Sequence, residues 1–194
     1  YKTNEYEDIF QEWPFELSDF QKWAIWAYKN EKNVIITANT GCGKTLPSEY
    51  AMKDVVEHKK KRVIYTTPLK ALSNEKYHTF KEKYKHISFG LMTGDNQDNP
   101  DADVLVMTTE MYRNMLYKKD MIAEETITKE MAALKFDMDL ENELGLVVYD
   151  EIPYFNNKER GGVWEESIMK TPVTAQIMGL SATLNKPDDF CEWL

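Results

Sequence analysis

The chain has 194 residues, and its 24 Lys and Arg against 33 Asp and Glu give a formal net charge of −9 at pH 7. Its 42% of hydrophobic residues exclude a disordered protein and suffice for the core of one domain. No run approaches the roughly 20 apolar residues of a membrane-spanning helix, and two cysteines exclude a disulfide framework and a four-cysteine zinc site.

Short β-rich runs alternate with helical patterns along the chain. Several of these runs are continuously apolar, which is typical of strands covered on both faces. In chain order we expect a helix over 18–30, a strand over 33–38, a helix over 44–58, a strand over 62–67, a helix over 71–85, strands over 87–93, 103–108 and 146–150, a helix over 162–169 and a strand over 174–180. The alternation predicts βαβ units and a three-layer α/β fold with a mostly parallel central sheet.

One segment, residues 118–143, interrupts this alternation. It is rich in Asp and Glu, and its pattern predicts a helix followed by a solvated acidic turn. We expect an acidic surface insertion without catalytic consequence. Because no internal repeat or low-complexity linker is visible elsewhere, residues 1–194 are predicted to form a single domain.

The run ANTGCGKT directly follows the first predicted strand and leads into a helical pattern. Glycines allow a tight turn whose backbone N–H groups point at phosphate oxygens, and the following helix adds the positive end of its dipole. The strand before, the helix after and the spacing favour an ATP phosphate loop over a chance GKT. The residues predicted to bind the ATP phosphates are Thr40, Gly41, Cys42, Gly43, Lys44 and Thr45.

The strand predicted over 146–150 ends in two acids, Asp150 and Glu151. A phosphate-loop enzyme needs one carboxylate for the Mg²⁺ shell and a second to orient or deprotonate the attacking water. We therefore expect Thr45 and Asp150 to hold Mg²⁺ and Glu151 to activate water. With Lys44 on the β- and γ-phosphates, the predicted catalytic set is Lys44, Asp150 and Glu151.

The chain resembles the first RecA-like domain of superfamily 2 DExH-box RNA helicases of the superkiller/exosome-associated type. Beside ANTGCGKT and the acidic pair, four further runs match the family's motifs in order: FELSDFQ at 15–21, TPLKALSN at 67–74, TTE at 108–110 and SAT at 181–183. The resemblance covers nearly the whole chain. It implies a RecA-like P-loop NTPase fold, ATP and Mg²⁺ as cofactors, and ATP hydrolysis coupled to RNA unwinding or translocation.

The resemblance also implies roles for the other motif residues. Phe15 and Gln21 fall in the family's adenine-recognition segment, although Gln21 also completes a helix capping box with Ser18. Backbone contacts with a single RNA strand are implied for Pro68, Lys70, Ser73, Asn74, Thr108, Thr109, Glu110 and Arg160. For Lys70 and the two threonines, a plain strand-to-helix turn and helix caps are the alternative interpretation. Ser181 and Thr183 would couple the ATP state to RNA binding.

Three features depart from the family pattern, one of which is that residues 118–143 are longer than the usual connection at that place. Pro153 stands where the DExH motif has His, and it offers neither an imidazole nor a backbone N–H. The family's second RecA-like domain is not in this sequence, so the chain is expected to be the N-terminal lobe of a longer helicase and to hydrolyse ATP poorly alone. The alternatives are a DNA helicase or translocase lobe, and a nucleotide-gated nucleic-acid-binding module with impaired coupling.

The expected partners are single-stranded RNA and the second RecA-like domain of the same full-length chain, without a membrane. Sparse cysteines and the lack of a secretory signal pattern predict an intracellular, reducing compartment, the cytoplasm or the nucleus.

Overall fold

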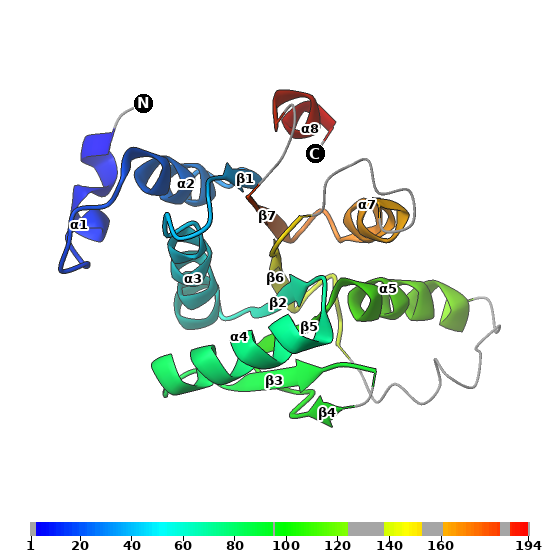
Figure 1. Ribbon diagram of the computed structural model, residues 1–194. Helices are drawn as coiled ribbons and strands as arrows, with labels where there is room; N and C mark the ends of the chain where they lie inside the picture. The colour runs from blue at the N-terminus through cyan, green and yellow to red at the C-terminus, as the bar shows by residue number, and fades with distance from the viewer. Residues whose placement is uncertain (1–2, 95, 124–137, 153–160, 183–186, 194) are drawn as a thin grey trace.

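The computed structural model describes residues 3–94, 96–123, 138–152, 161–182 and 187–193. In these residues, seven strands form one sheet in the order β1-β7-β6-β2-β5-β3-β4 (Figure 1), and every neighbouring pair except β3 and β4 is parallel. The strands are β1 (Val34–Thr37), β2 (Arg62–Thr67), β3 (Phe89–Met92), β4 (Gln97–Asp98), β5 (Val104–Thr108), β6 (Leu144–Tyr149) and β7 (Gln176–Ser181). The predicted, mostly parallel sheet is confirmed, and only the short β4 was not expected.

Helices cover both faces of the sheet, which confirms the three-layer fold (Figure 1). One face carries α2 (Asp19–Lys29), α3 (Thr45–Asp54) and α4 (Lys70–Lys83), and the other carries α5 (Thr109–Ala123) and α7 (Gly161–Lys170). The remaining described elements are a 3-10 turn η1 (Thr3–Tyr6), α1 (Glu7–Phe10), a π-helical turn η2 (Val55–Lys59) and α8 (Pro187–Trp193). None of the described helices is both long and apolar enough to cross a membrane.

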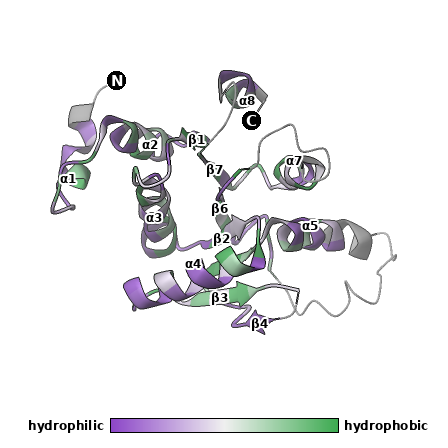
Figure 2. Ribbon diagram, in the orientation of Figure 1, coloured by the Kyte–Doolittle hydropathy of each residue, from purple (hydrophilic) through white to green (hydrophobic). Residues whose placement is uncertain are grey.

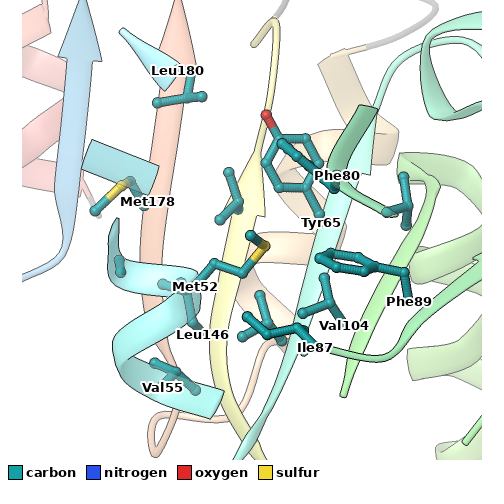
Figure 3. Close-up of a cluster of buried hydrophobic side chains, with 14 of the residues drawn as sticks. Met52, Val55, Tyr65, Phe80, Ile87, Phe89, Val104, Leu146, Met178 and Leu180 are labelled. Atoms are coloured by element: carbon teal, nitrogen blue, oxygen red, sulfur yellow. The ribbon is translucent and has the colours of Figure 1, made fainter. Parts of the chain in front are cut away.

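Each face of the sheet has its own apolar core. On the α2–α4 face, Tyr65 of β2 packs edge-on against Phe80 of α4, with ring centroids 5.0 Å apart. Figure 3 shows both rings among aliphatic side chains, with the Tyr65 oxygen at the end of the sheet where Leu180 lies. In Figure 2, β3 is hydrophobic along its length while much of α4 is hydrophilic, because α4 buries only one stripe.

The structure describes both ends of residues 118–143, the segment predicted to be an acidic insertion. Helix α5 begins at Thr109 and continues to Ala123, so the helix expected at the start of this segment is the end of a longer one. At its other end, Met138 and Leu140 are buried in the core cluster on the α5–α7 face. Residues 124–137 lie outside the described residues.

Arg62 joins the amino ends of the central strands. Its Nε donates a hydrogen bond to the carbonyl oxygen of Ala102 (2.9 Å) and its Nη2 to that of Pro100 (2.6 Å), both in the segment before β5. Nη1 lies 3.3 Å from Oε2 of Glu143, the residue before β6. These contacts fix three adjacent strands at the end opposite to the carboxyl ends that carry the site.

Candidate active site and nucleic-acid interface

The phosphate loop, the SAT run and the acidic pair meet at one edge of the sheet. β1 pairs with β7 and β7 with β6, so their carboxyl ends are adjacent. Beyond the strands, the Ala38 N–H donates to the Ser181 carbonyl oxygen (3.1 Å), and the Ile152 N–H donates to the Leu180 carbonyl oxygen (2.8 Å). Residues predicted from three separate motifs therefore lie side by side.

The loop between β1 and α3 depends on its glycines. Gly41 and Gly43 have φ values of 86° and 76°, a region that residues with side chains rarely adopt. A Cβ on Gly43 would lie 2.7 Å from Nε2 of Gln21, whereas one on Gly41 would meet nothing within 4 Å. Thr40 and Cys42 are exposed beside them. Such a backbone turn, exposed to solvent, is suited to binding an anion through its N–H groups.

Lys44 ends the loop, and Thr45 begins α3. Lys44 is only 7% exposed, and its Nζ lies 3.2 Å from Oε1 of Glu151, close enough for an ion pair. However, this ammonium forms no hydrogen bond with any described residue. A buried cation with unused N–H donors at a helix N-terminus matches an anionic phosphate ligand, so these residues fit the triphosphate of ATP.

Asp150, directly after β6, is buried, and both of its side-chain contacts among the described residues are to Oδ2. The Tyr65 hydroxyl donates to Oδ2 (2.8 Å), and Nζ of Lys76 lies 3.2 Å from it. Burial, reinforced by the Asp150 charge, raises the pKa of Tyr65 well above its usual value. The hydroxyl therefore stays protonated and donates to the carboxylate.

Glu151, like the two loop glycines, has a left-handed backbone conformation. Its φ is 53°, which costs a residue with a side chain about 1–2 kcal/mol. The side chain is 44% exposed, so the carboxylate reaches solvent beyond Lys44. Each acid of the pair thus faces one lysine, Asp150 facing Lys76 and Glu151 facing Lys44.

Gln21 links the start of α2 to the phosphate loop. Its Oε1 accepts a hydrogen bond from the Ser18 N–H (2.9 Å), and its Nε2 donates to the Gly43 carbonyl oxygen (3.0 Å). The capping box that was one interpretation of Gln21 is present. The amide still has a second N–H and a second lone pair for another ligand, and Phe15 lies exposed in the segment before α2.

A second predicted group gathers around a cavity of about 200 Å³ between the turns that follow β2 and β5. The cavity is lined by Pro68, Leu69, Lys70, Thr108, Thr109, Glu110, Val163 and Trp164. The two turns are adjacent because Thr67 pairs with Thr108 in neighbouring parallel strands. Five residues predicted to contact nucleic acid therefore share one surface with the start of α7.

The remaining residues of these turns differ in exposure. Asn74 is exposed, whereas Ser73 is fully buried, and its hydroxyl lies 2.8 Å from the Thr67 hydroxyl. Thr109 also bonds internally, donating to the Thr67 carbonyl oxygen (3.3 Å), and the Thr108 hydroxyl accepts from the Met111 N–H (3.3 Å) at the start of α5. The hydroxyls of Ser73 and Thr109 thus hold the turns in place, and that of Thr108 caps a helix.

Ser181 connects two motifs at the sheet edge. It is buried, and its hydroxyl donates to the Ile152 carbonyl oxygen (3.2 Å). The ends of β6 and β7 are therefore joined through Ser181 and Ile152. Pro153, Arg160 and Thr183 lie outside the described residues.

Tyr65, Lys76 and Trp164 were missed in the sequence. In the sequence, Tyr65 looks like a packing residue inside a strand. Trp164, in α7, packs against Tyr149, with the two ring centroids 5.4 Å apart. Lys76 did carry a signal. It occupies the helical stripe of Ser73 and Phe80, where an apolar residue is expected, so a lysine there indicates a partner for its charge.

The family model described as DEAD/DEAH box helicase matches residues 18–190. The chain belongs to the DEAD/DEAH box helicase family. Its matches among characterised helicases include "Antiviral helicase SKI2" of Saccharomyces cerevisiae (39% identical over 182 residues, 94% of the chain and 13% of SKI2) and "Exosome RNA helicase MTR4" of Homo sapiens (40% over 184 residues, 95% and 16%). "mRNA transport homolog 4" of Caenorhabditis elegans is 43% identical over 182 residues, 94% of the chain and 16% of that protein. The predicted resemblance to the superkiller/exosome-associated type is confirmed.

Solved structures support the fold of this helicase domain. The helicase MrfA bound to DNA and AMPPNP superposes with a TM-score of 0.68 at 17% identity, covering 95% of this chain and 26% of MrfA. Mycobacterium smegmatis Lhr bound to ssDNA and AMP-PNP gives 0.62 at 24% identity, covering 96% and 25%. At this identity the likeness confirms the predicted RecA-like fold alone.

Proposed function

We propose that this DEAD/DEAH box helicase domain is the ATP-binding lobe of an ATP-dependent RNA helicase. The observation that carries the proposal is the buried Lys44 ammonium at the end of the phosphate loop, which lies 3.2 Å from Oε1 of Glu151 and has no hydrogen-bond partner among the described residues. Relatives named RNA helicases at 38–40% identity favour RNA over DNA. The chain spans only 13–17% of the length of the curated relatives, so the action of the whole protein is part of the proposal.

In this proposal the phosphate-loop N–H groups and Lys44 bind the β- and γ-phosphates. Thr45 and Asp150 hold Mg²⁺, which when bound neutralises charge that develops on the transferred phosphoryl group. Glu151 orients and deprotonates the attacking water. Because Lys44 pairs with Glu151 in the structure, binding of the γ-phosphate gives Lys44 a new anionic partner and frees the Glu151 carboxylate for water.

The adenine would lie against Phe15 and Gln21, whose amide already contacts the phosphate loop. A single RNA strand would follow the cavity at Pro68, Lys70 and Glu110, with Asn74 and Arg160 as further contacts. Ser73, Thr108 and Thr109 shape this surface through their internal hydrogen bonds. Contacts of this kind read the sugar–phosphate backbone and carry no base sequence.

Translocation requires a second RecA-like domain that closes on this one around ATP, and we propose it in the same full-length chain. Ser181 would then transmit the state of the acidic pair through Ile152. An intracellular, reducing location, the cytoplasm or the nucleus, agrees with the two exposed cysteines, Cys42 and Cys191, which form no disulfide.

Calorimetric titration with Mg²⁺ and AMP-PNP tests the nucleotide site. We expect Lys44→Ala to weaken binding at least about tenfold, since a charge-assisted contact to phosphate is worth about 1.5–3 kcal/mol. The matched control is Lys32→Ala, which removes an exposed lysine outside the site. Equal affinity of wild type and Lys44→Ala would place the nucleotide elsewhere.

The choice between RNA and DNA needs a separate titration with RNA and DNA strands of the same sequence. An RNA helicase lobe should prefer the ribose strand, because only 2′-hydroxyls distinguish the two backbones. Equal or tighter binding of the DNA strand would favour the alternative, a DNA translocase lobe.

A further inference from the structure

The Asp150 carboxylate is held from two directions through one oxygen. Oδ2 accepts the hydrogen bond of the Tyr65 hydroxyl (2.8 Å) and faces the Lys76 ammonium (3.2 Å). Both contacts are made by Oδ2, and no contact to the other carboxylate oxygen, Oδ1, is seen among the described residues. The two partners thus fix the rotation of the carboxylate and leave Oδ1 for a metal or a metal-bound water.

These two partners belong to elements that differ in their place in the fold. Tyr65 lies in β2, a central strand paired on both sides, and it is fully buried. Lys76 lies in α4, on the surface of the sheet, with about a quarter of its side chain exposed. Its ammonium lies 5.9 Å from the Tyr65 ring centroid and 6.0 Å from that of Phe80. The lysine side chain therefore runs beside these two core rings to reach Asp150.

Helix α4 also begins in the cavity where the proposed RNA strand lies. Its first residue, Lys70, lines that cavity, and Lys76 follows six residues later, about 9 Å along the helix axis at 1.5 Å per residue. Lys70 and Lys76 thus belong to one continuous helix of 14 residues. If strand binding displaced the first turn of α4 as part of a rigid helix, the ammonium beside Asp150 would move with it.

We propose that Lys76 is a positioning residue that couples the nucleic-acid strand at Lys70 to the orientation of the Asp150 carboxylate. This inference rests on the proposed function, since it takes RNA at the cavity and Mg²⁺·ATP at Asp150. Tyr65 is the fixed support of the carboxylate, and Lys76 is the support that moves with α4. RNA binding thereby changes the affinity for the metal–nucleotide complex without a direct contact between the two ligands.

A purely structural ion pair makes a different prediction. Removal of Lys76 would then leave the Asp150 charge without its partner and weaken the site equally with and without RNA. The decisive quantity is the ratio of Mg²⁺·AMP-PNP affinities measured in the presence and absence of a single-stranded oligouridine. This ratio is a coupling constant and requires no turnover.

We would measure this ratio by calorimetry on the wild-type chain and on Lys76→Gln, Lys76→Arg and Tyr65→Phe. Wild type should show a ratio of about five or more, a usual size for coupling between sites. In Lys76→Gln the ratio should fall to within twofold of one, while affinity for oligouridine alone and for AMP-PNP in EDTA stays within twofold of wild type. Lys76→Arg should restore the ratio, since it keeps the charge and the reach.

Tyr65→Phe is the matched control, because it removes the contact that the central strand β2 makes to the Asp150 carboxylate. It removes the other contact to Oδ2 and should weaken Mg²⁺·AMP-PNP binding by the same factor with and without oligouridine, which leaves the ratio unchanged. Near-UV circular dichroism establishes that each variant is folded.

Two results separate failure of this inference from failure of the proposed function. The role of Lys76 is overturned, and the proposed function stands, in either of two cases. The first is a ratio near one in a wild-type chain that binds both ligands. The second is a ratio in Lys76→Gln that equals the wild-type ratio. A folded wild-type chain that binds neither AMP-PNP nor oligouridine overturns both.

Discussion

Lys44 and Lys76 both lie beside carboxylates, yet their surroundings differ. Lys44 has an ion-pair distance to Glu151 but no hydrogen bond in the described part of the chain, and it sits at the start of a helix. Lys76 faces an acid whose same oxygen also accepts a tyrosine hydroxyl. The Lys44 ammonium therefore keeps unused N–H donors that fit an anionic ligand, whereas Lys76 shares its carboxylate oxygen with a second donor.

Gly43 gives a test at the same scale. Gly43→Ala should lower the free energy of unfolding by about 1–2 kcal/mol through its positive φ. It should also weaken Mg²⁺·AMP-PNP binding, because the new Cβ displaces the Gln21 amide from the phosphate loop. Urea denaturation and calorimetry measure the two effects.

Gly41→Ala is the control for Gly43, since its φ is also positive but a Cβ there meets nothing within 4 Å. It should share the loss of stability and keep Gln21 in place. If the two variants bind nucleotide equally, the contact between Gln21 and the loop has no part in binding.

At the scale of elements, strand order decides which motifs meet. β1, β7 and β6 are neighbours although β1 and β6 are separated by more than 100 residues in the chain, and β2 and β5 are neighbours on the other side. Because all five strands are parallel, their carboxyl ends lie on one edge of the sheet. The phosphate-loop side and the cavity side of the site therefore correspond to two adjacent groups of strands, and α4 packs on the cavity side, against β2, β5 and β3.

Arg62 provides the corresponding prediction on stability. Arg62→Met keeps much of the aliphatic stem but removes three contacts at the amino ends of β2, β5 and β6. We expect the free energy of unfolding to fall by about 2–3 kcal/mol, since hydrogen bonds of a charged group to partly buried partners are among the stronger ones. Urea denaturation checks this value, and Lys32→Met controls for the lost surface charge.

The site lies about 20 Å from Arg62 along a six-residue strand, at roughly 3.3 Å per residue. Nucleotide affinity of the folded Arg62→Met variant should therefore match wild type. A change in affinity without a change in stability would contradict the assignment of Arg62 to the framework.

At the scale of the whole molecule, the two cores enclose many tyrosines. Burial is the main cause that raises the pKa of Tyr28, Tyr65, Tyr84, Tyr112 and Tyr149 above the usual value. In the unfolded chain these phenols ionise near pH 10. Between that pH and their raised folded values, the unfolded state binds fewer protons than the folded state.

Stability should therefore be constant with respect to these tyrosines below about pH 9 and fall steeply above pH 10, by up to about 1.4 kcal/mol per pH unit for each tyrosine. Urea midpoints between pH 8 and 11 measure the slope, and absorbance of the phenolate reports whether ionisation accompanies unfolding. Tyr149→Phe should lower the number of protons released on unfolding by about one, and so reduce the slope of the unfolding free energy against pH accordingly. An unchanged slope in that variant would mean that Tyr149 titrates in the folded state.

Much of the fold and part of the site could be predicted from local patterns. Short β-rich runs predicted six strands, and several of these runs are continuously apolar because strands covered on both faces need no polar alternation. The long helix α5 was not separated from the acidic segment, since its charged carboxyl end hides the buried stripe of Met111, Tyr112 and Met115. Lys76 and Tyr65 were not recognised as site residues, because their partner Asp150 is more than 70 residues away in the chain.

The sequence by itself determined the parallel α/β fold, the phosphate loop and the acidic pair, because glycine conformation, helix starts and strand ends are local properties. Only the tertiary structure decided which partner each charge has. It placed Lys44 against Glu151 and Lys76 against Asp150, since electrostatic contacts depend on distance in space and on burial. Strand order, which no local pattern contains, created those distances.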